Sequence, residues 1–206
     1  MTANVSESFH RRAAGFSPGG WGLALGVAVV LMLAAALPEP WQDALSYQRG
    51  AVVEGLQGWR LLGAQALHLG WPHLWLNLGA WLLLCLLLLP GVSARSLSLV
   101  LAGSVVGTAS GLLLTPGLAW YVGFSGALHG VLGGGAILLL RARPALAASL
   151  LLGLAIKLLW DVLSGGGSGG LPAGARVVVE AHVWGSLGGL LAGGLHWWFT
   201  RRPRCV

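Results

Sequence analysis

The sequence predicts an all-α polytopic membrane protein. Of its 206 residues, 56% are hydrophobic and only 9% are charged, and its mean hydropathy is +0.78. A soluble domain carries about 25% charged residues, so this chain cannot cover a surface that faces water. This excludes a soluble enzyme, a disordered tail and a nucleic-acid-binding module. A membrane-crossing helix needs roughly 20 mostly apolar residues, and six stretches qualify: 21–37, 72–89, 96–114, 123–140, 145–163 and 181–200.

The first stretch resembles a secretory signal because Arg11 and Arg12 precede it. However, no small-residue cleavage site follows at Leu37-Pro38-Glu39-Pro40, and the apolar run is long for a signal core. It therefore reads as a retained span. The expected organisation is an N-terminal tail at 1–20, a six-span domain at 21–200 with a long outside loop at 38–71, and a C-terminal tail at 201–206.

The basic residues predict the orientation, because cytoplasmic loops of membrane proteins carry an excess of Lys and Arg. Both termini are expected in the cytoplasm. The net charge of +6 is attributed to the location of the basic residues in the membrane topology rather than to a nucleic-acid-binding patch. With the N-terminus inside, eight arginines lie in cytoplasmic segments and three outside: Arg11, Arg12, Arg95, Arg141, Arg143, Arg201, Arg202 and Arg204 against Arg49, Arg60 and Arg176.

The two outside loops differ in composition. The loop at 38–71 contains Trp41, Trp59 and Trp71 and is expected to lie in the membrane interface. The last outside loop, 164–176, is rich in glycine and is expected to be flexible. Cys85 and Cys205 form neither a plausible disulfide nor a metal-binding spacing, and no metal or cofactor is expected.

Polar residues within the spans predict a site near the outer surface, since such residues are costly in lipid. The second, fourth and sixth spans all run from outside to inside. Asn77, Ser125 and His182 each lie a few residues after the start of one of them, roughly 5–8 Å deep at 1.5 Å per residue. Taken singly, each has an ordinary structural explanation, such as interhelical hydrogen bonding by Asn77. Their common depth favours a site.

The residue types at this depth predict acyl-transfer chemistry. Ser125 and His182 form the minimal nucleophile and base pair. Ser125 lies between Gly123 and Gly126 at a helix start, where free N–H groups and the helix dipole favour a nearby anion. His73 and Asn77 share a helix face and can donate hydrogen bonds to one oxyanion. Glu180 faces another direction from His182, so the sequence predicts a dyad without an acidic third member.

Two further patterns concern packing. The fourth and sixth spans carry glycines at every fourth position, which allows helices to approach closely and would bring His182 to Ser125; these glycines are Gly126, Gly130, Gly134, Gly185, Gly189 and Gly193. On the fifth span Lys157 and Asp161 are four residues apart, and the favoured interpretation is an ion pair that acts as a structural clamp.

Taken together, these motifs resemble the rhomboid family of intramembrane serine proteases. The resemblance implies a six-helix bundle, the Ser125–His182 dyad, an oxyanion site formed by His73, Asn77 and the Ser125 backbone N–H, and a water-filled cavity open to the outside. It rests on Trp59-Arg60 in the first loop, His68-x4-His73-x3-Asn77, Gly123-Phe124-Ser125-Gly126, and Ala181-His182-x2-Gly185-x3-Gly189-x3-Gly193.

One position suggests a branch of the family. Many rhomboids carry a tyrosine four residues after the serine, where its ring packs on the catalytic histidine, whereas this chain has His129. The Ser-Gly-x-Leu-His-Gly string and the small size resemble the rhombosortase branch, although Gln65 stands where that branch is expected to have histidine. This resemblance implies a bacterial inner-membrane enzyme that opens to the periplasm and processes proteins with a Gly-Gly-type C-terminal membrane tail. The imidazole of His129 either supports the base or substitutes for the ring stack.

Two other functions fit parts of the sequence. A catalytically silent rhomboid-fold protein that binds or guides membrane clients would share the fold, but the presence of Ser125 and His182 argues against it. A small transporter would use Lys157, Asp161 and the histidines as a proton path, but only two opposite charges lie deep in the spans. The expected partners are a transmembrane protein substrate and the lipid bilayer, without nucleic acid.

Overall fold

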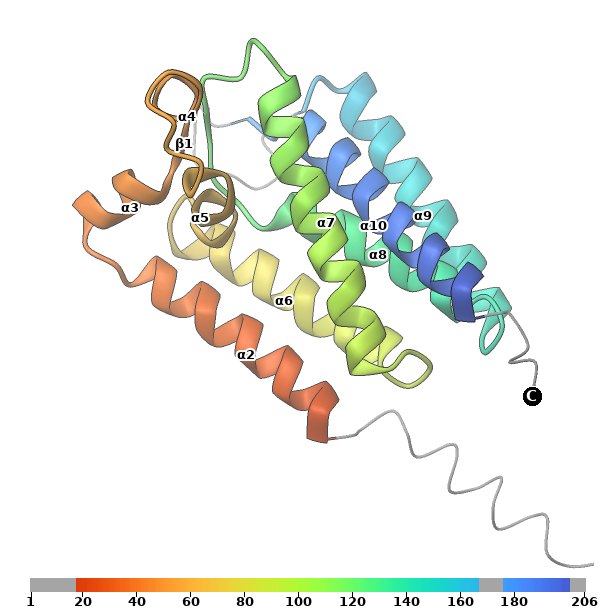
Figure 1. Cartoon of the computed structure of the whole chain (residues 1–206). Coiled ribbons are helices and arrows are strands. Elements are labelled where there is room, and N and C mark those ends of the chain that lie inside the picture. Colours follow the sequence, from red (N-terminus) through yellow and green to blue (C-terminus); the bar gives the residue numbers. More distant parts are fainter. Residues whose placement is uncertain (1–17, 167–175, 201–206) are drawn as a thin grey trace, which may run out of the picture.

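The structure, a computed structural model, describes residues 18–166 and 176–200. A helix lies at each of the six predicted stretches, with ends within three residues of those expected, and the all-α polytopic membrane fold is confirmed (Figure 1). These helices are α2 (Pro18–Ala35), α6 (Trp71–Leu88), α7 (Ala94–Leu114), α8 (Ser125–Leu139), α9 (Pro144–Leu163) and α10 (Val179–Thr200).

Among the described residues, four helices are long and apolar enough to cross a membrane, namely α2, α6, α7 and α9. Helix α8 is apolar but has only 15 residues, and α10 has 22 residues with more polar ones among them. The count of six spans therefore stays a prediction. The start of α2 and the end of α10 lie at the same end of the bundle (Figure 1).

The segment at 38–71 is more structured than a loop. It forms α3 (Glu39–Leu45), α4 (Arg49–Val53) and α5 (Arg60–Ala66), and the strand β1 (Tyr47–Gln48) pairs antiparallel with β2 (Trp120–Tyr121). In this pair Tyr47 lies opposite Tyr121. The tail at 201–206, residues 1–17 of the other tail and most of the glycine-rich loop (167–175) lie outside the described residues.

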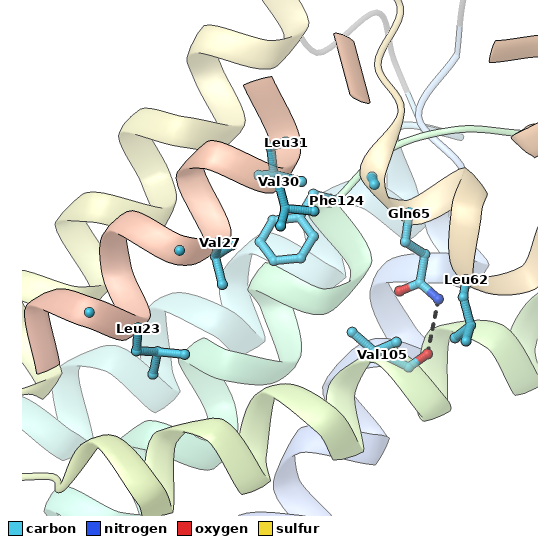
Figure 2. Close-up of a pocket in the computed structure, with 11 residues that line it drawn as sticks. Leu23, Val27, Val30, Leu31, Leu62, Gln65, Val105 and Phe124 are labelled. Carbon is cyan, nitrogen blue, oxygen red and sulfur yellow. Dashed lines mark hydrogen bonds between the residues drawn. The ribbon is translucent and has the colours of Figure 1, made fainter. Parts of the chain in front are cut away.

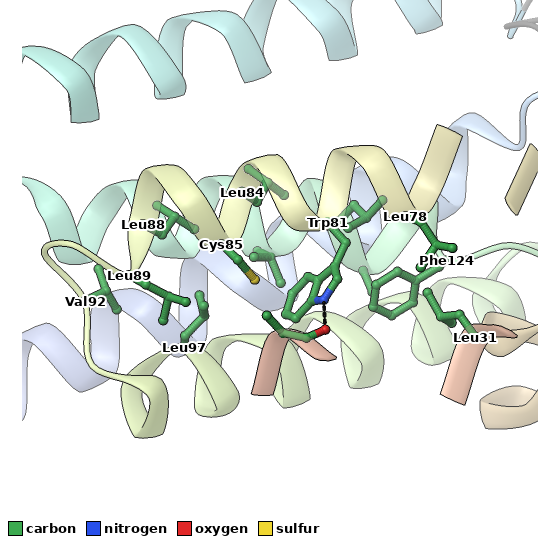
Figure 3. Packing of buried hydrophobic residues seen from close by; sticks show 14 of the residues in the cluster. Leu31, Leu78, Trp81, Leu84, Cys85, Leu88, Leu89, Val92, Leu97 and Phe124 are labelled. Carbon is green, nitrogen blue, oxygen red and sulfur yellow. Dashed lines mark hydrogen bonds between the residues drawn. The ribbon is translucent and has the colours of Figure 1, made fainter. Parts of the chain in front are cut away.

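An apolar core joins α2 and α6 to the start of α8 (Figure 3). Trp81 is fully buried, and its indole Nε1–H donates to the carbonyl oxygen of Ala24 at 2.9 Å, so this large side chain is buried without an unsatisfied polar atom. Phe124 packs edge-on against Trp81, with ring centroids 6.1 Å apart. The residue just before Ser125 is thereby anchored in the core.

Backbone contacts between glycines join α8 to α10. A Cβ atom at Gly185, Gly189 or Gly193 would overlap the backbone of Gly126, Gly130 or Gly134, respectively. The predicted pairing of the two glycine stripes is therefore confirmed. A second seam, which the sequence analysis did not identify, joins α10 to α7, where Gly188 packs on Gly103 and Gly107. Helix α10 thus contacts a neighbour at backbone distance on two faces.

Candidate active site

A cavity of about 580 Å³ lies between α6, α8, α9 and α10, and β2 borders it. The four residues predicted to carry the chemistry, His73, Asn77, Ser125 and His182, all line it. Along α6 the wall continues with apolar side chains from Leu76 to Leu87. The cavity therefore combines a polar end with an apolar wall.

The serine and histidine are in hydrogen-bonding contact. The Ser125 Oγ and His182 Nε2 atoms are 2.9 Å apart. Ser125 is the first residue of α8, and His182 lies in the first turn of α10, so the α8–α10 glycine seam sets the distance between them. His182 is only 4% exposed, which protects its ring from competing contacts with bulk solvent. This geometry is that of a nucleophile and a general base.

His73 presents a hydrogen-bond donor to the cavity. The backbone N–H of Leu69 donates to His73 Nδ1 at 3.2 Å, so in the neutral ring the proton resides on Nε2. A Cβ at residue 123 would lie 3.2 Å from His73 Cε1, and Gly123 has a φ of 140°; both features favour glycine there. One N–H of the Asn77 amide donates to the His73 carbonyl at 2.9 Å, and its second N–H is a further donor.

His129 stacks on His182 as the resemblance implied for the ring at this position. The ring centroids are 3.9 Å apart and the planes differ by 15°. His129 Nδ1 is 2.8 Å from the Ser125 carbonyl oxygen, which can only accept, so Nδ1 carries a proton. This bond and the stack fix the ring of His129 against the flat face of the base.

Asp161 is a site residue that the sequence analysis missed. Its Oδ2 is 2.9 Å from His182 Nδ1, so an acidic side chain contacts His182, which the sequence analysis did not predict. The predicted pairing with Lys157 is confirmed, with Lys157 Nζ 2.5 and 2.6 Å from the two carboxylate oxygens. Asp161 lies two residues before the end of α9, which runs opposite to α8 and α10. Its depth is therefore similar to that of Ser125 and His182, but depth alone does not show which way the Asp161 side chain faces.

Among the residues that the structure describes, one group of side chains contains the residue types that bind metal ions. The ligand atoms of His129, Asp161 and His182 all lie within 4.8 Å of one another. Yet both Asp161 oxygens contact the Lys157 ammonium, and His182 Nδ1 already bonds one of them. A cation bound there would be repelled by Lys157 at close range, so the donor set favours a hydrogen-bonded network.

Of three other predicted supporting residues, only His68 contacts a residue that lines the cavity. Arg60 donates to the carbonyl oxygens of Asp43 and Ser46 at 2.6 and 2.9 Å, and Trp59 Nε1–H donates to the carbonyl oxygen of Ala44, so both stabilise the 38–71 segment. His68 packs edge-on against His73, with centroids 5.1 Å apart. Burial, together with the nearby His73, lowers the pKa of His68 to about 4.

The 38–71 segment also contacts the stretch of chain just before Ser125. The Gly123 N–H donates to the Ala64 carbonyl of α5 at 2.9 Å, and the buried Tyr121 hydroxyl donates to the Gly123 carbonyl at 2.7 Å. Burial raises the pKa of Tyr121, which keeps the phenol neutral as a donor. Both polar groups of Gly123 are therefore bonded.

A second cavity, of about 380 Å³, lies between α2, α5 and α7 (Figure 2). Its lining is apolar apart from Gln65, whose Nε2 donates to the Val105 carbonyl at 3.0 Å. Phe124 contributes to its wall, but the cavity contains none of the residues around Ser125 and His182 described above. It is separate from the candidate active site.

Comparison with known families agrees with this geometry. The Rhomboid domain model matches residues 55–199, well over half of the chain. Comparison with curated proteins gives no match. The matched region begins before α5 and ends at the last turn of α10, so it contains every residue of the candidate active site. The chain belongs to the rhomboid family.

Proposed function

We propose that the chain is an intramembrane serine endopeptidase in which Ser125 is the nucleophile and His182 the general base and acid. The observation that carries this proposal is the 2.9 Å contact between Ser125 Oγ and His182 Nε2 inside a cavity that also holds His73 and Asn77. Membership of the rhomboid family, whose members are intramembrane serine proteases, supports it.

In this mechanism Ser125 Oγ bonds to the carbonyl carbon of the scissile peptide while its proton moves to His182 Nε2. The electron pair of the carbonyl moves to its oxygen, where the His73 Nε2–H, the second Asn77 N–H and the Ser125 backbone N–H are donors for the developing charge. His182 then gives the proton to the leaving amine. Water, deprotonated by the same imidazole, hydrolyses the acyl-enzyme and restores Ser125.

The substrate is a transmembrane protein, and we place the chain in the rhombosortase branch. His129 within Ser-Gly-x-Leu-His-Gly supports this branch, and its substrates would carry a Gly-Gly-type C-terminal membrane tail. Glycine weakens a substrate helix, so the scissile backbone can leave its helical hydrogen bonds and reach Ser125. The apolar wall of α6 between Leu76 and Leu87 suits the rest of such a segment.

The proposed location is the bacterial inner membrane, with both termini in the cytoplasm and the active site open to the periplasm. The distribution of arginines supports this orientation. The proposed organisation is one six-span domain at 21–200 with short tails at 1–20 and 201–206. A cysteine-accessibility assay on intact cells, with single cysteines in the 38–71 segment and near residue 142, tests the sidedness.

The test of the function uses a fluorophosphonate probe on detergent-solubilised wild type, Ser125→Ala and His182→Ala. We expect wild type to be labelled and both variants to lose labelling while keeping the wild-type Tm. The same three proteins, reconstituted with a single-span peptide that carries Gly-Gly in its tail, should show cleavage by wild type alone.

Absence of labelling in a folded wild type would support the alternative of a silent rhomboid-fold protein that binds membrane clients. The transporter alternative receives no support from the network, because Lys157 and Asp161 are paired with each other rather than arranged along a path. Proton flux in vesicles that Lys157→Ala abolishes would revive it.

A further inference from the structure

We infer that Asp161 is the third member of a Ser125–His182–Asp161 triad, a positioning residue that acts through His182; this inference rests on the proposed function. Both ring nitrogens of His182 are engaged at the same distance, Nε2 with Ser125 Oγ and Nδ1 with Asp161 Oδ2, each at 2.9 Å. The three side chains come from α8, α10 and α9, so the contact requires the tertiary fold.

The bond to Asp161 determines which nitrogen of His182 can act as the base. An ionised carboxylate only accepts hydrogen bonds, so the proton of the neutral ring must lie on Nδ1. The lone pair then lies on Nε2 and faces the Ser125 hydroxyl. Without this partner the ring is free to adopt the other tautomer, in which Nε2 carries a proton and cannot take one from Ser125.

Burial makes this arrangement different from a surface ion pair. Asp161 is 4% exposed and is the only charged residue among the three buried ones on α9, the others being Ala147 and Leu154. A bare carboxylate in this position would be expensive. The Lys157 ammonium contacts both of its oxygens, and the Lys157 side chain is 47% exposed, so the cation reaches water while it stabilises the buried anion.

The charges of the network also match the proton transfer. When the Ser125 proton moves to His182 Nε2, the ring becomes an imidazolium beside the Asp161 carboxylate, which stabilises it without taking the proton. The other titratable groups around the ring are His129, which stacks on it, Lys157 on α9, and His73 across the cavity. Among these groups Asp161 supplies the negative charge.

If Asp161 belonged only to a structural clamp, its pairing with Lys157 would be its whole role. Removing both partners of the pair together tests this alternative. Replacing a buried ion pair by apolar residues of similar size is often neutral for stability. The double variant Lys157→Met/Asp161→Leu should therefore stay folded, with a Tm lowered only by the loss of the His182 Nδ1 hydrogen bond. We expect its maximal fluorophosphonate labelling rate, at saturating probe, to fall by roughly 10²- to 10⁴-fold, with the half-saturating probe concentration unchanged. Asp161→Asn should show the same loss, and Asp161→Glu should recover part of the rate.

The controls separate this inference from the function on which it rests. Labelling that persists in Ser125→Ala or His182→Ala would overturn the proposed function, and the role of Asp161 with it. Labelling that is lost in those two variants but stays at the wild-type rate in the double variant would overturn the role of Asp161 alone. A double variant that is folded and slow, together with a partly active Asp161→Glu, is the result that the triad requires.

Discussion

Two sides of the bundle meet at the cavity, and they are built differently. Helices α7, α8 and α10 form a glycine-sealed side, on which backbones touch at Gly126–Gly185, Gly130–Gly189 and Gly103–Gly188. Ten of the 15 residues of α8 are buried. On α9, by contrast, the buried residues are Ala147, Leu154 and Asp161.

The two sides fix the positions of different site residues in different ways. Ser125 and His182 belong to the glycine-sealed side, so backbone contacts, which tolerate little change, set their distance. His73, Asn77 and Asp161 come from α6 and α9, which are held by side chains. Substitutions at the glycines of the first side should therefore affect folding and activity together, whereas substitutions of these three polar side chains should mainly affect activity.

The largest effect on stability at neutral pH is expected from closing the space in the glycine seam. A Cβ at Gly189 would overlap the backbone of Gly130, so Gly189→Ala should lower the free energy of unfolding by about 1–3 kcal/mol or more and reduce labelling. Gly194 lies on the same helix with nothing within 4 Å of its Cβ position, so Gly194→Ala should be neutral or stabilising by up to about 1 kcal/mol. Thermal unfolding in one detergent compares the two variants. Equal Tm values would contradict the claim that close contact at Gly189 stabilises the fold.

The next effect concerns the donors on α6. Removing either one, in His73→Ala or Asn77→Ala, should lower peptide cleavage by on the order of 10²- to 10³-fold, because each donor acts on charge that develops during the reaction. Both variants should remain folded. Leu76→Ala is the matched control, since Leu76 lines the same cavity without a donor. If the donor variants cleave as well as Leu76→Ala, the oxyanion assignment is wrong.

A smaller effect is expected at the ring stack. Losing the stack in His129→Ala should lower activity by roughly 2- to 10-fold, the equivalent of about 0.5–1.5 kcal/mol for an aromatic pair. His129→Tyr restores an aromatic ring and should recover most of the activity, as measured by peptide cleavage. A tyrosine variant as inactive as Ser125→Ala would instead mean that the imidazole itself takes part in proton transfer.

The effect that is smallest at neutral pH concerns His68, next to α6. Its pKa of about 4 in the folded chain lies below the 6.5 of an exposed histidine, so the unfolded chain binds more protons between these values. Stability should therefore decrease as the pH falls from about 6.5 to about 4. His68→Leu should show a smaller decrease of Tm over this interval than wild type. Parallel Tm curves for the two proteins would show that the pKa of His68 is the same in the folded and the unfolded chain.

The sequence predicted the long helices well because hydropathy alone reports them. It grouped Asn77, Ser125 and His182 by their common depth, which follows from helix rise, and added His73 because it shares a helix face with Asn77. It could not predict Asp161, since the rotation of α9 about its axis depends on packing and Lys157 offers the carboxylate a local partner. The sequence did not predict the β1–β2 pair either, for another reason. Two residues per strand give no periodicity, and their pairing depends on contacts between segments some 70 residues apart.

The contacts of Gly123 have a consequence for transplanting parts of this molecule. The N–H of Gly123 bonds to Ala64 of α5, and β2 pairs with β1, so the approach to the nucleophile is shaped by a segment that precedes it by a whole helical hairpin. In a chimera that takes its 38–71 segment from a relative, the new segment would not be matched to β2 and to Gly123. Because Tyr47, Arg49 and Gln65 also bond to carbonyl oxygens between residues 105 and 115, a graft of residues 38–71 would need residues 105–124 as well.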